Sequence, residues 1–242
     1  MTKIPEALAH GRAPAAFAVK ATSRGRALSD RRLHLPEHSW SNDPERRTAA
    51  GIPEMVQFAT KPRLAAEMIE AALDAGITAS WVTGDEAYGQ DPQLRAALQA
   101  RGIGYVLAVA CSTRVRINQG RTPARADALA GRLPATVWHR QSAGYGAKGP
   151  RYYDWAWIHI DTGSHRHLLI RRNRSTGELA FYLCWSPVEV TLSELVRVAG
   201  AAGASRSASR PPRTRSDSTT TRSATGPHGT GTSRLPCSPW PS

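Results

Sequence analysis

The chain has few cysteines and no long hydrophobic run, and these absences exclude several classes of protein. Its three cysteines, Cys111, Cys184 and Cys237, include no Cys-x-x-Cys pair, so neither a zinc ribbon nor a disulfide framework is indicated. No apolar run approaches the ~18 residues that a membrane span requires. No continuous apolar segment follows Lys3, as it would in a secretory signal. We therefore expect a cytoplasmic protein without a membrane anchor.

Acidic residues are also scarce, since 19 Asp and Glu stand against 32 Lys and Arg, which leaves a formal net charge of +13. A basic surplus of this size suggests a polyanionic partner, and nucleic acid is the first candidate. A solvated basic surface or a basic tail is the alternative. The 242 residues suffice for one sizeable domain, or for a core domain with an insertion and a tail.

Hydrophobic periodicity before residue 110 predicts an α/β sheet. Pro62 suits a first helical turn and is followed by an apolar stripe, while Asp91 suits the N-cap of a second helix. Alternating helices and strands imply a sheet with crossover connections. The predicted elements are helices at 62–75 and 91–100 and strands at 17–19, 27–35, 79–83 and 105–110.

The second half of the chain is predicted to be rich in β-structure. Residues 152–160 alternate, with Tyr153, Trp155 and Trp157 on one face of a strand. Further strands at 167–171 and 179–185 complete a meander, and a helix is expected at 191–199. Beyond residue 200 almost every residue is Ala, Ser, Thr, Arg, Gly or Pro, so the segment 201–242 is expected to be disordered.

Asp85 is the residue at which we expect chemistry. It follows the strand 79–83 within Trp81-Val-Thr-Gly-Asp-Glu-Ala-Tyr-Gly89, at the carboxyl end, where ligands bind in open α/β sheets. A carboxylate there is a good Mg²⁺ ligand, because Mg²⁺ prefers hard oxygen donors. The alternative is that Asp85 only caps the turn that follows.

Six blocks of sequence in the same order resemble the DDE transposases of bacterial insertion sequences, in particular the IS-seven-oh-one type. The resemblance covers roughly residues 17–200 and implies a ribonuclease-H-like fold, in which three acidic residues hold two divalent metal ions, expected to be Mg²⁺, ~3.5–4 Å apart. It also implies that the partner is DNA, which such enzymes cut and join at insertion-sequence ends. The blocks are Arg24-Gly-Arg-Ala-Leu28, Asp30-Arg-Arg-Leu-His-Leu-Pro36, Phe58-Ala-Thr-Lys-Pro62, Trp81-Val-Thr-Gly-Asp-Glu-Ala-Tyr-Gly89, Tyr105-Val-Leu-Ala-Val109 and Leu195-Val-Arg-Val-Ala-Gly200.

Asp85 matches the second of the three acids, and the other two have no match in this chain. Nothing before Phe17 resembles the strand that carries the first acid. The third acid should follow Gly200 in Arg-Trp-x-x-Glu, where this chain has Ala201-Ala-Gly-Ala-Ser. A one-base shift in GC-rich codons for this stretch can restore Arg-Trp-Gly-Val-Glu, so we expect a truncated chain with a frameshift near codon 201. A lone carboxylate predicts the loss of strand transfer.

The resemblance and the composition together predict an α/β, ribonuclease-H-like mixed sheet that is incomplete and carries a β-rich insertion. Each predicted segment has its own range. These are a non-matching N-terminal segment (1–16), a partial ribonuclease-H-like core (17–110), the β-rich insertion (111–188), the start of the final catalytic-domain helix (189–200) and a disordered, out-of-frame tail (201–242).

Because the family acts on DNA, the resemblance favours a DNA-facing surface on the predicted β insertion, where basic and aromatic residues would contact phosphates and bases. The alternative is that the aromatic residues pack the sheet and the arginines are solvated. A second functional hypothesis is a non-catalytic DNA-binding or transposition-interfering protein that associates with itself or with intact transposase subunits. A third is an unstable pseudogene product. The predicted DNA contacts are Arg114, Arg116, Lys148, Arg151, Arg171 and Arg172.

Overall fold

A computed structural model describes residues 15–22, 25–34, 42–52, 56–146, 149–161 and 165–208. The predicted tail beyond Ala208 and most of the predicted N-terminal segment lie outside these ranges. Within them, every helix is too short or too polar to cross a membrane.

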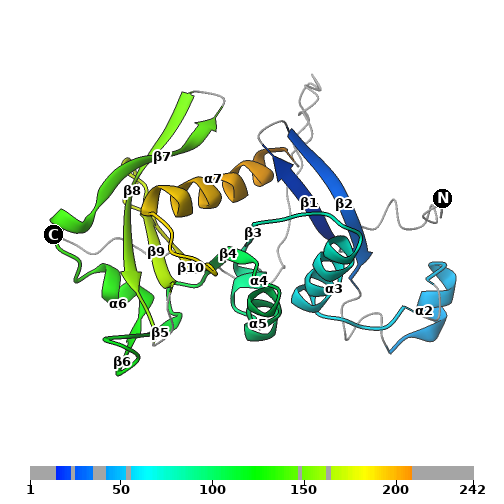
Figure 1. Cartoon of the computed structure of the whole chain (residues 1–242). Coiled ribbons are helices and arrows are strands. Elements are labelled where there is room, and N and C mark those ends of the chain that lie inside the picture. Colours follow the sequence, from blue (N-terminus) through cyan, green and yellow to red (C-terminus); the bar gives the residue numbers. More distant parts are fainter. Residues whose placement is uncertain are drawn as a thin grey trace, which may run out of the picture.

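The centre of the molecule is one six-stranded sheet (Figure 1). Its first two strands are parallel, and every other neighbouring pair is antiparallel. The fold is therefore mixed α/β, as predicted, and it is consistent with a ribonuclease-H-like sheet. In spatial order the strands are β3 (Trp81–Gly84), β4 (Gly104–Val109), β10 (Leu179–Trp185), β9 (Arg166–Arg172), β8 (Gly149–His159) and β7 (His139–Gly146).

The predicted core and the predicted insertion share this sheet. Strand β10, from the insertion, pairs with β4, from the core, and Phe181 lies opposite Val109. The continuous apolar run of β4 explains the pairing, because a strand with Val106 and Leu107 almost fully buried must be covered on both faces and bonded on both edges.

The crossover between β3 and β4 forms as the sequence predicts. Helix α3 (Lys61–Asp74) is capped by Thr60, and α5 (Pro92–Ala100) is capped by Asp91, whose carboxylate accepts a hydrogen bond from the Leu94 N–H at 2.8 Å. Leu94 and Leu98 of α5 form one cluster with Tyr105 and Leu107 of β4, and Ile69 and Leu73 of α3 pack against it. Leu64 and Met68 of α3 form a separate cluster with Ala18. The chain therefore passes from β3 to the parallel strand β4 through a crossover that contains α5, which packs on β4.

Both faces of the antiparallel part of the sheet are covered, which explains the alternation along β8. Trp155 lies in a cluster beneath α7 (Leu192–Ala208), together with Leu195 and Val196. On the other face, Ile158 and Ile160 pack toward α6 (Ala126–Ala130). This second layer also contains the hairpin of β5 (Arg114–Ile117) and β6 (Thr122–Arg125) and a short 3₁₀ turn (Ala135–Val137).

Several elements differ from the prediction. The stretch between the strand predicted at 27–35 and the helix predicted at 62–75 contains α2 (Pro44–Ala49), which is capped by Asp43 but buries no residue. Strands β5, β6 and β7 carry polar and basic residues and so lack the apolar alternation that predicts a strand. Helix α7 continues eight residues past the predicted boundary at 200, to Ala208, since the alanines that follow favour a helix.

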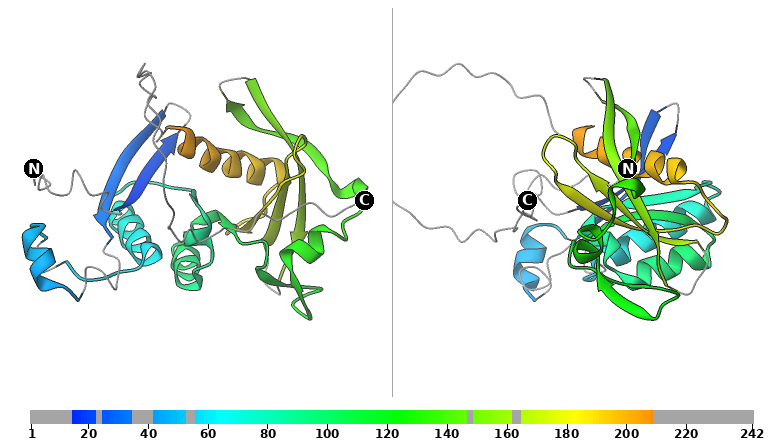
Figure 2. Two further views of the ribbon diagram at one scale, coloured as in Figure 1. Left: turned by 180° about the vertical axis from the view of Figure 1, so that it is seen from behind. Right: turned by 90° about the vertical axis from the view of Figure 1, so that its left-hand side faces the viewer.

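The hairpin of β1 (Ala15–Thr22) and β2 (Gly25–Leu33) forms a separate two-stranded sheet. Figure 2 shows it at the opposite end of the molecule from β7 and β8, close to α3 and to the far end of α7. In the described residues, β3 is therefore the last strand on its side of the main sheet.

Candidate functional site

Asp85 lies directly after β3, and its side chain is exposed. Its carboxylate accepts a hydrogen bond from the Ala87 backbone N–H at 3.1 Å and so caps the short helix α4 (Glu86–Gly89). The capping role that the local pattern allowed is therefore present. A carboxylate offers about four lone-pair positions, so this role is compatible with ligand binding by the same side chain.

Two glycines of the motif fix the position of Asp85. A Cβ at Gly84 would lie 3.1 Å from both Leu107 Cδ2 and Tyr88 Cβ. A Cβ at Gly89 would lie 1.9 Å from the Ala108 carbonyl oxygen, far inside contact distance. Helix α4 therefore rests directly on β4, and this packing requires glycine at position 89, whereas a Cβ at position 84 would need a small shift of the Leu107 or Tyr88 side chain.

Tyr88 is a neighbour of Asp85 that the sequence analysis did not single out. It lies three residues after Asp85, within one helical turn, and it is partly buried. Burial and, secondarily, the negative charge of Asp85 raise the pKa of the Tyr88 phenol. The Tyr88 phenol is therefore protonated and lies beside the Asp85 carboxylate. In the sequence, only its position three residues after Asp85 indicates that the two side chains are neighbours.

The described residues do not fit a two-metal centre. Asp85 supplies a hard oxygen donor of the kind that Mg²⁺ prefers. Among the residues that the structure describes, however, no three His, Cys, Asp or Glu side chains gather into a group that could hold a metal ion. Glu86, the adjacent acid, accepts a hydrogen bond from Gln90 along its own helix at 3.1 Å. No catalytic step can be derived from this set.

The predicted DNA contacts lie on three separate elements. Arg114 and Arg116 are exposed on β5, Arg151 lies on β8, and Arg171 and Arg172 lie on β9. The sixth predicted contact, Lys148, lies outside the described residues.

Arg151 joins two elements of the fold. Its Nη2 donates hydrogen bonds to the Ala143 carbonyl oxygen at 2.8 Å and to the Gly200 carbonyl oxygen at 3.1 Å. It thus connects the edge strand β7 to the helix α7 that covers the sheet. The backbones of β7 and α7 lie close together at this contact. A Cβ at Gly200 would lie only 2.2 Å from the Ala143 carbonyl oxygen.

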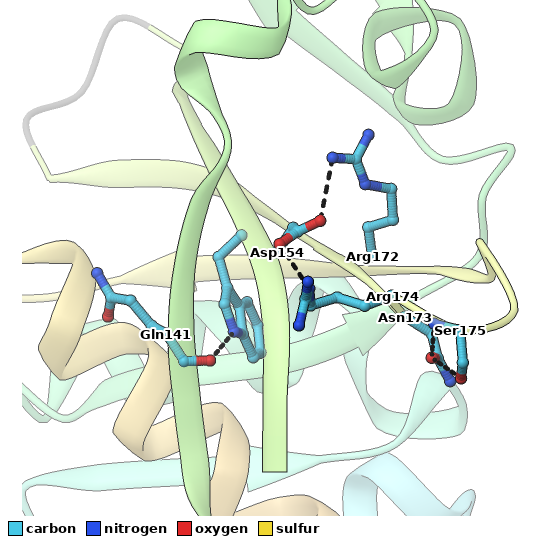
Figure 3. Close-up of polar contacts among 7 residues, drawn as sticks. Gln141, Asp154, Arg172, Asn173, Arg174 and Ser175 are labelled. Atoms are coloured by element: carbon cyan, nitrogen blue, oxygen red, sulfur yellow. Dashed lines mark hydrogen bonds and ion pairs between the residues drawn. The ribbon is translucent and has the colours of Figure 1, made fainter.

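Arg171 and Arg172 are consecutive residues of β9 and so point to opposite faces of the sheet. Arg171 lies over the Tyr153 ring, with 4.7 Å between its guanidinium carbon and the ring centroid. Arg172 lies 4.2 Å over the Trp138 ring and donates a hydrogen bond to Asp154 at 3.1 Å. Arg174 approaches the other oxygen of Asp154 at 3.5 Å, and Figure 3 shows both contacts.

The β5–β6 hairpin holds the most exposed of the predicted contacts. Arg114 lies directly opposite Arg125 in the ladder. Like charges in this position repel each other and destabilise the hairpin unless an anion lies nearby. Arg125 is neutralised by Asp127 at 2.6 Å, and hydrogen bonds from Arg125 lower the pKa of the Asp127 carboxyl. Arg114 and Arg116 remain exposed and positive on the same face of β5.

Residues 13–165 match the sequence profile of the DDE superfamily endonucleases, which is more than half of the chain. The chain belongs to the DDE superfamily endonuclease family. The matched range contains the Asp85 motif and the strands from β1 to β8, so it confirms the resemblance at the level of the family. No curated protein matches this DDE superfamily endonuclease.

Proposed function

We propose that this DDE superfamily endonuclease chain is a piece of an insertion-sequence transposase that binds DNA but does not cut or join it. The observation that carries the proposal is the placement of Asp85 at the end of β3 without a three-acid group among the described residues. A single carboxylate cannot hold the two metal ions, for which Mg²⁺ is the expected species, so charge developing on the phosphate is uncompensated.

The β5–β6 hairpin supports DNA binding. Arg114 and Arg116 present two exposed cations on one face, and the matching family acts on nucleic acid. Phosphate contacts of this kind contribute affinity without sequence specificity and weaken steeply with salt. We therefore propose Arg114 and Arg116 as the first phosphate contacts. Arg151, Arg171, Arg172 and Lys148 complete the proposed set.

Cleavage assays test the inactive state directly. The purified chain is incubated with labelled insertion-sequence ends and Mg²⁺ or Mn²⁺, beside an Asp85→Asn variant. We expect nicking and joining to be equally undetectable for both proteins. Activity in the parent chain that Asp85→Asn abolishes would show that the missing acids are supplied from elsewhere, and the proposal would be wrong.

DNA binding is tested by the salt dependence of affinity. Replacing both Arg114 and Arg116 with Gln should weaken binding and reduce the slope of log K against log salt by roughly two, or about one for each lost phosphate contact. The matched control replaces Arg63 and Arg101. Both are exposed and lie away from the β5–β6 hairpin, where Arg63 pairs with Glu67 and Arg101 pairs with Asp74 of α3. Equal losses of DNA affinity in the two double variants would show that the effect depends on net charge and not on the position of Arg114 and Arg116.

The origin of the chain is a separate part of the proposal. We propose a frameshift near codon 201 in an IS-seven-oh-one-type gene, because Ala201 and the residues that follow replace the acid-bearing block of the family. The nucleotide sequence of the locus decides this. A one-base shift that restores Arg-Trp-x-x-Glu would support it, while an intact frame without that alternative would favour a non-catalytic DNA-binding or interfering protein.

A further inference from the structure

Two histidines face each other across the neighbouring strands β8 and β9 (Figure 1). His159 is the last residue of β8 and lies directly opposite His167 of β9 in the antiparallel ladder. Side chains at directly opposite positions extend from the same face of a sheet, with their Cβ atoms about 4.5–5.5 Å apart. Trp157, two residues before His159, lies on the same face and packs against the cluster beneath α7. The two imidazoles are therefore neighbours at the end of the face that α7 covers.

The two imidazole rings have the spacing that a shared metal ion requires. Their centroids are 5.2 Å apart, and their planes are inclined to each other at 80°. Two imidazoles that bind one Zn²⁺ tetrahedrally, with each ligating nitrogen about 2.0–2.1 Å from the metal, place their ring centroids roughly 5 Å apart. The backbone therefore already holds His159 and His167 at the separation of a two-histidine chelate.

The surroundings of His167 hold its ring in place and leave one nitrogen available. The ring stacks on Trp157, with 4.6 Å between the two centroids and 22° between the two planes. The Nδ1 atom of His167 is buried and has no hydrogen-bond partner within the described ranges of the chain. A buried nitrogen without a partner costs free energy, and a metal ion bound to its lone pair would remove that cost. His159 is exposed, so an ion can reach the pair from solvent.

We propose that His159 and His167 together bind one late first-row transition-metal ion, such as Zn²⁺, which joins β8 to β9. Imidazole nitrogen is a ligand that suits Zn²⁺, Ni²⁺ and Cu²⁺, whereas Mg²⁺ prefers oxygen donors. In the part of the chain that the structure describes, no third His, Cys, Asp or Glu side chain joins the pair in a metal-binding group, so solvent completes the coordination. The site is distinct from the Asp85 carboxylate in both its ligands and the class of ion that it selects.

The test is a titration of the full chain, purified without a polyhistidine tag, with Zn²⁺. Calorimetry measures the affinity, and NMR of the imidazole rings identifies the ligands. We expect the ring signals of His159 and His167 to shift together. His159→Gln and His167→Gln should each weaken binding about tenfold or more, because loss of even an outer partner of a metal ligand costs roughly 10–100-fold in affinity. His139→Gln, which replaces an exposed histidine of β7, is the matched control and should bind Zn²⁺ as the parent chain does.

His159→Gln decides the result, because its side chain is exposed and its replacement should leave the metal-free urea midpoint unchanged. Zn²⁺ should raise the midpoint of the parent chain but not that of His159→Gln, since an ion that binds only the folded state stabilises it. Undiminished binding by His159→Gln, or ring shifts confined to other histidines, would overturn the proposal. Displacement of Zn²⁺ by an equal concentration of Mg²⁺ would also overturn it, because oxygen ligands would then hold the ion. These outcomes are independent of DNA binding and of Asp85.

Discussion

The two sides of strand β4 differ in how completely they are packed. On the β10 side, the cluster beneath α7 contains twelve buried residues, among them Trp155 and Leu195, and the helix is locked to β7 through Arg151. On the β3 side, the contact of α3 with the hairpin buries only Leu64 and Met68, and a groove remains. This difference implies that the cluster beneath α7 contributes more to stability than the contact of α3 with the hairpin does.

Truncation of a buried leucine on each side should show the largest contrast. Leu195→Ala removes a fully buried side chain from the α7 cluster, and we expect it to cost about 2–5 kcal/mol of unfolding free energy. Leu64→Ala lies in the two-residue cluster, where the surroundings can collapse into the space, and should cost less. Urea unfolding of both variants measures the difference. Equal losses would show that the two sides are packed alike.

Close backbone contacts provide a second comparison. Gly89→Ala and Gly200→Ala each place a Cβ against a carbonyl oxygen, at Ala108 and Ala143 respectively, and overpacking of this kind costs about 1–3 kcal/mol. We expect Gly200→Ala to be the more destabilising, because Arg151 prevents α7 from moving away. Gly131→Ala is the control, because a Cβ there meets no atom closer than the Asp127 carbonyl oxygen at 3.8 Å, and it should leave the urea midpoint unchanged.

The pH dependence of stability should be concentrated on the antiparallel side. Burial, together with the nearby charges of His159 and His165, lowers the pKa of His167 from 6.5 to about 4. The unfolded chain binds the proton more readily, so stability present above pH 6.5 is lost as the pH falls toward 4. His167→Gln should flatten this part of the profile. The exposed His139→Gln should not, and an unchanged slope in His167→Gln would contradict the assignment.

Helix capping should give the smallest effects. Asp91→Ala removes the cap of α5, which packs on β4, and should cost about 1 kcal/mol of global stability. Asp43→Ala removes an equivalent cap from α2, which buries no residue, so it should change local hydrogen exchange without moving the global unfolding midpoint. A global loss in Asp43→Ala would show that α2 is coupled to the main sheet.

Local signals in the sequence were sufficient for elements whose apolar pattern is strong. The helices at α3 and α5, the buried strand β4 and the alternation of β8 follow from periodicity and capping residues. The hairpin β5–β6 and the edge strand β7 could not be predicted in this way, because their exposed polar residues leave no periodic trace. The Asp85 motif was identified from its position after a strand and from its resemblance to the family.

The sequence by itself therefore determined the α/β class, the crossover that places Asp85 at a strand end and the family to which the chain belongs. Only the tertiary structure decided that β10 pairs with β4, that Arg151 joins the fold together and that a groove remains beside β3. Periodicity and capping arise from neighbours within a few residues. Strand order, shared sheets and unfilled space depend on contacts between segments far apart in the chain, which no local pattern records.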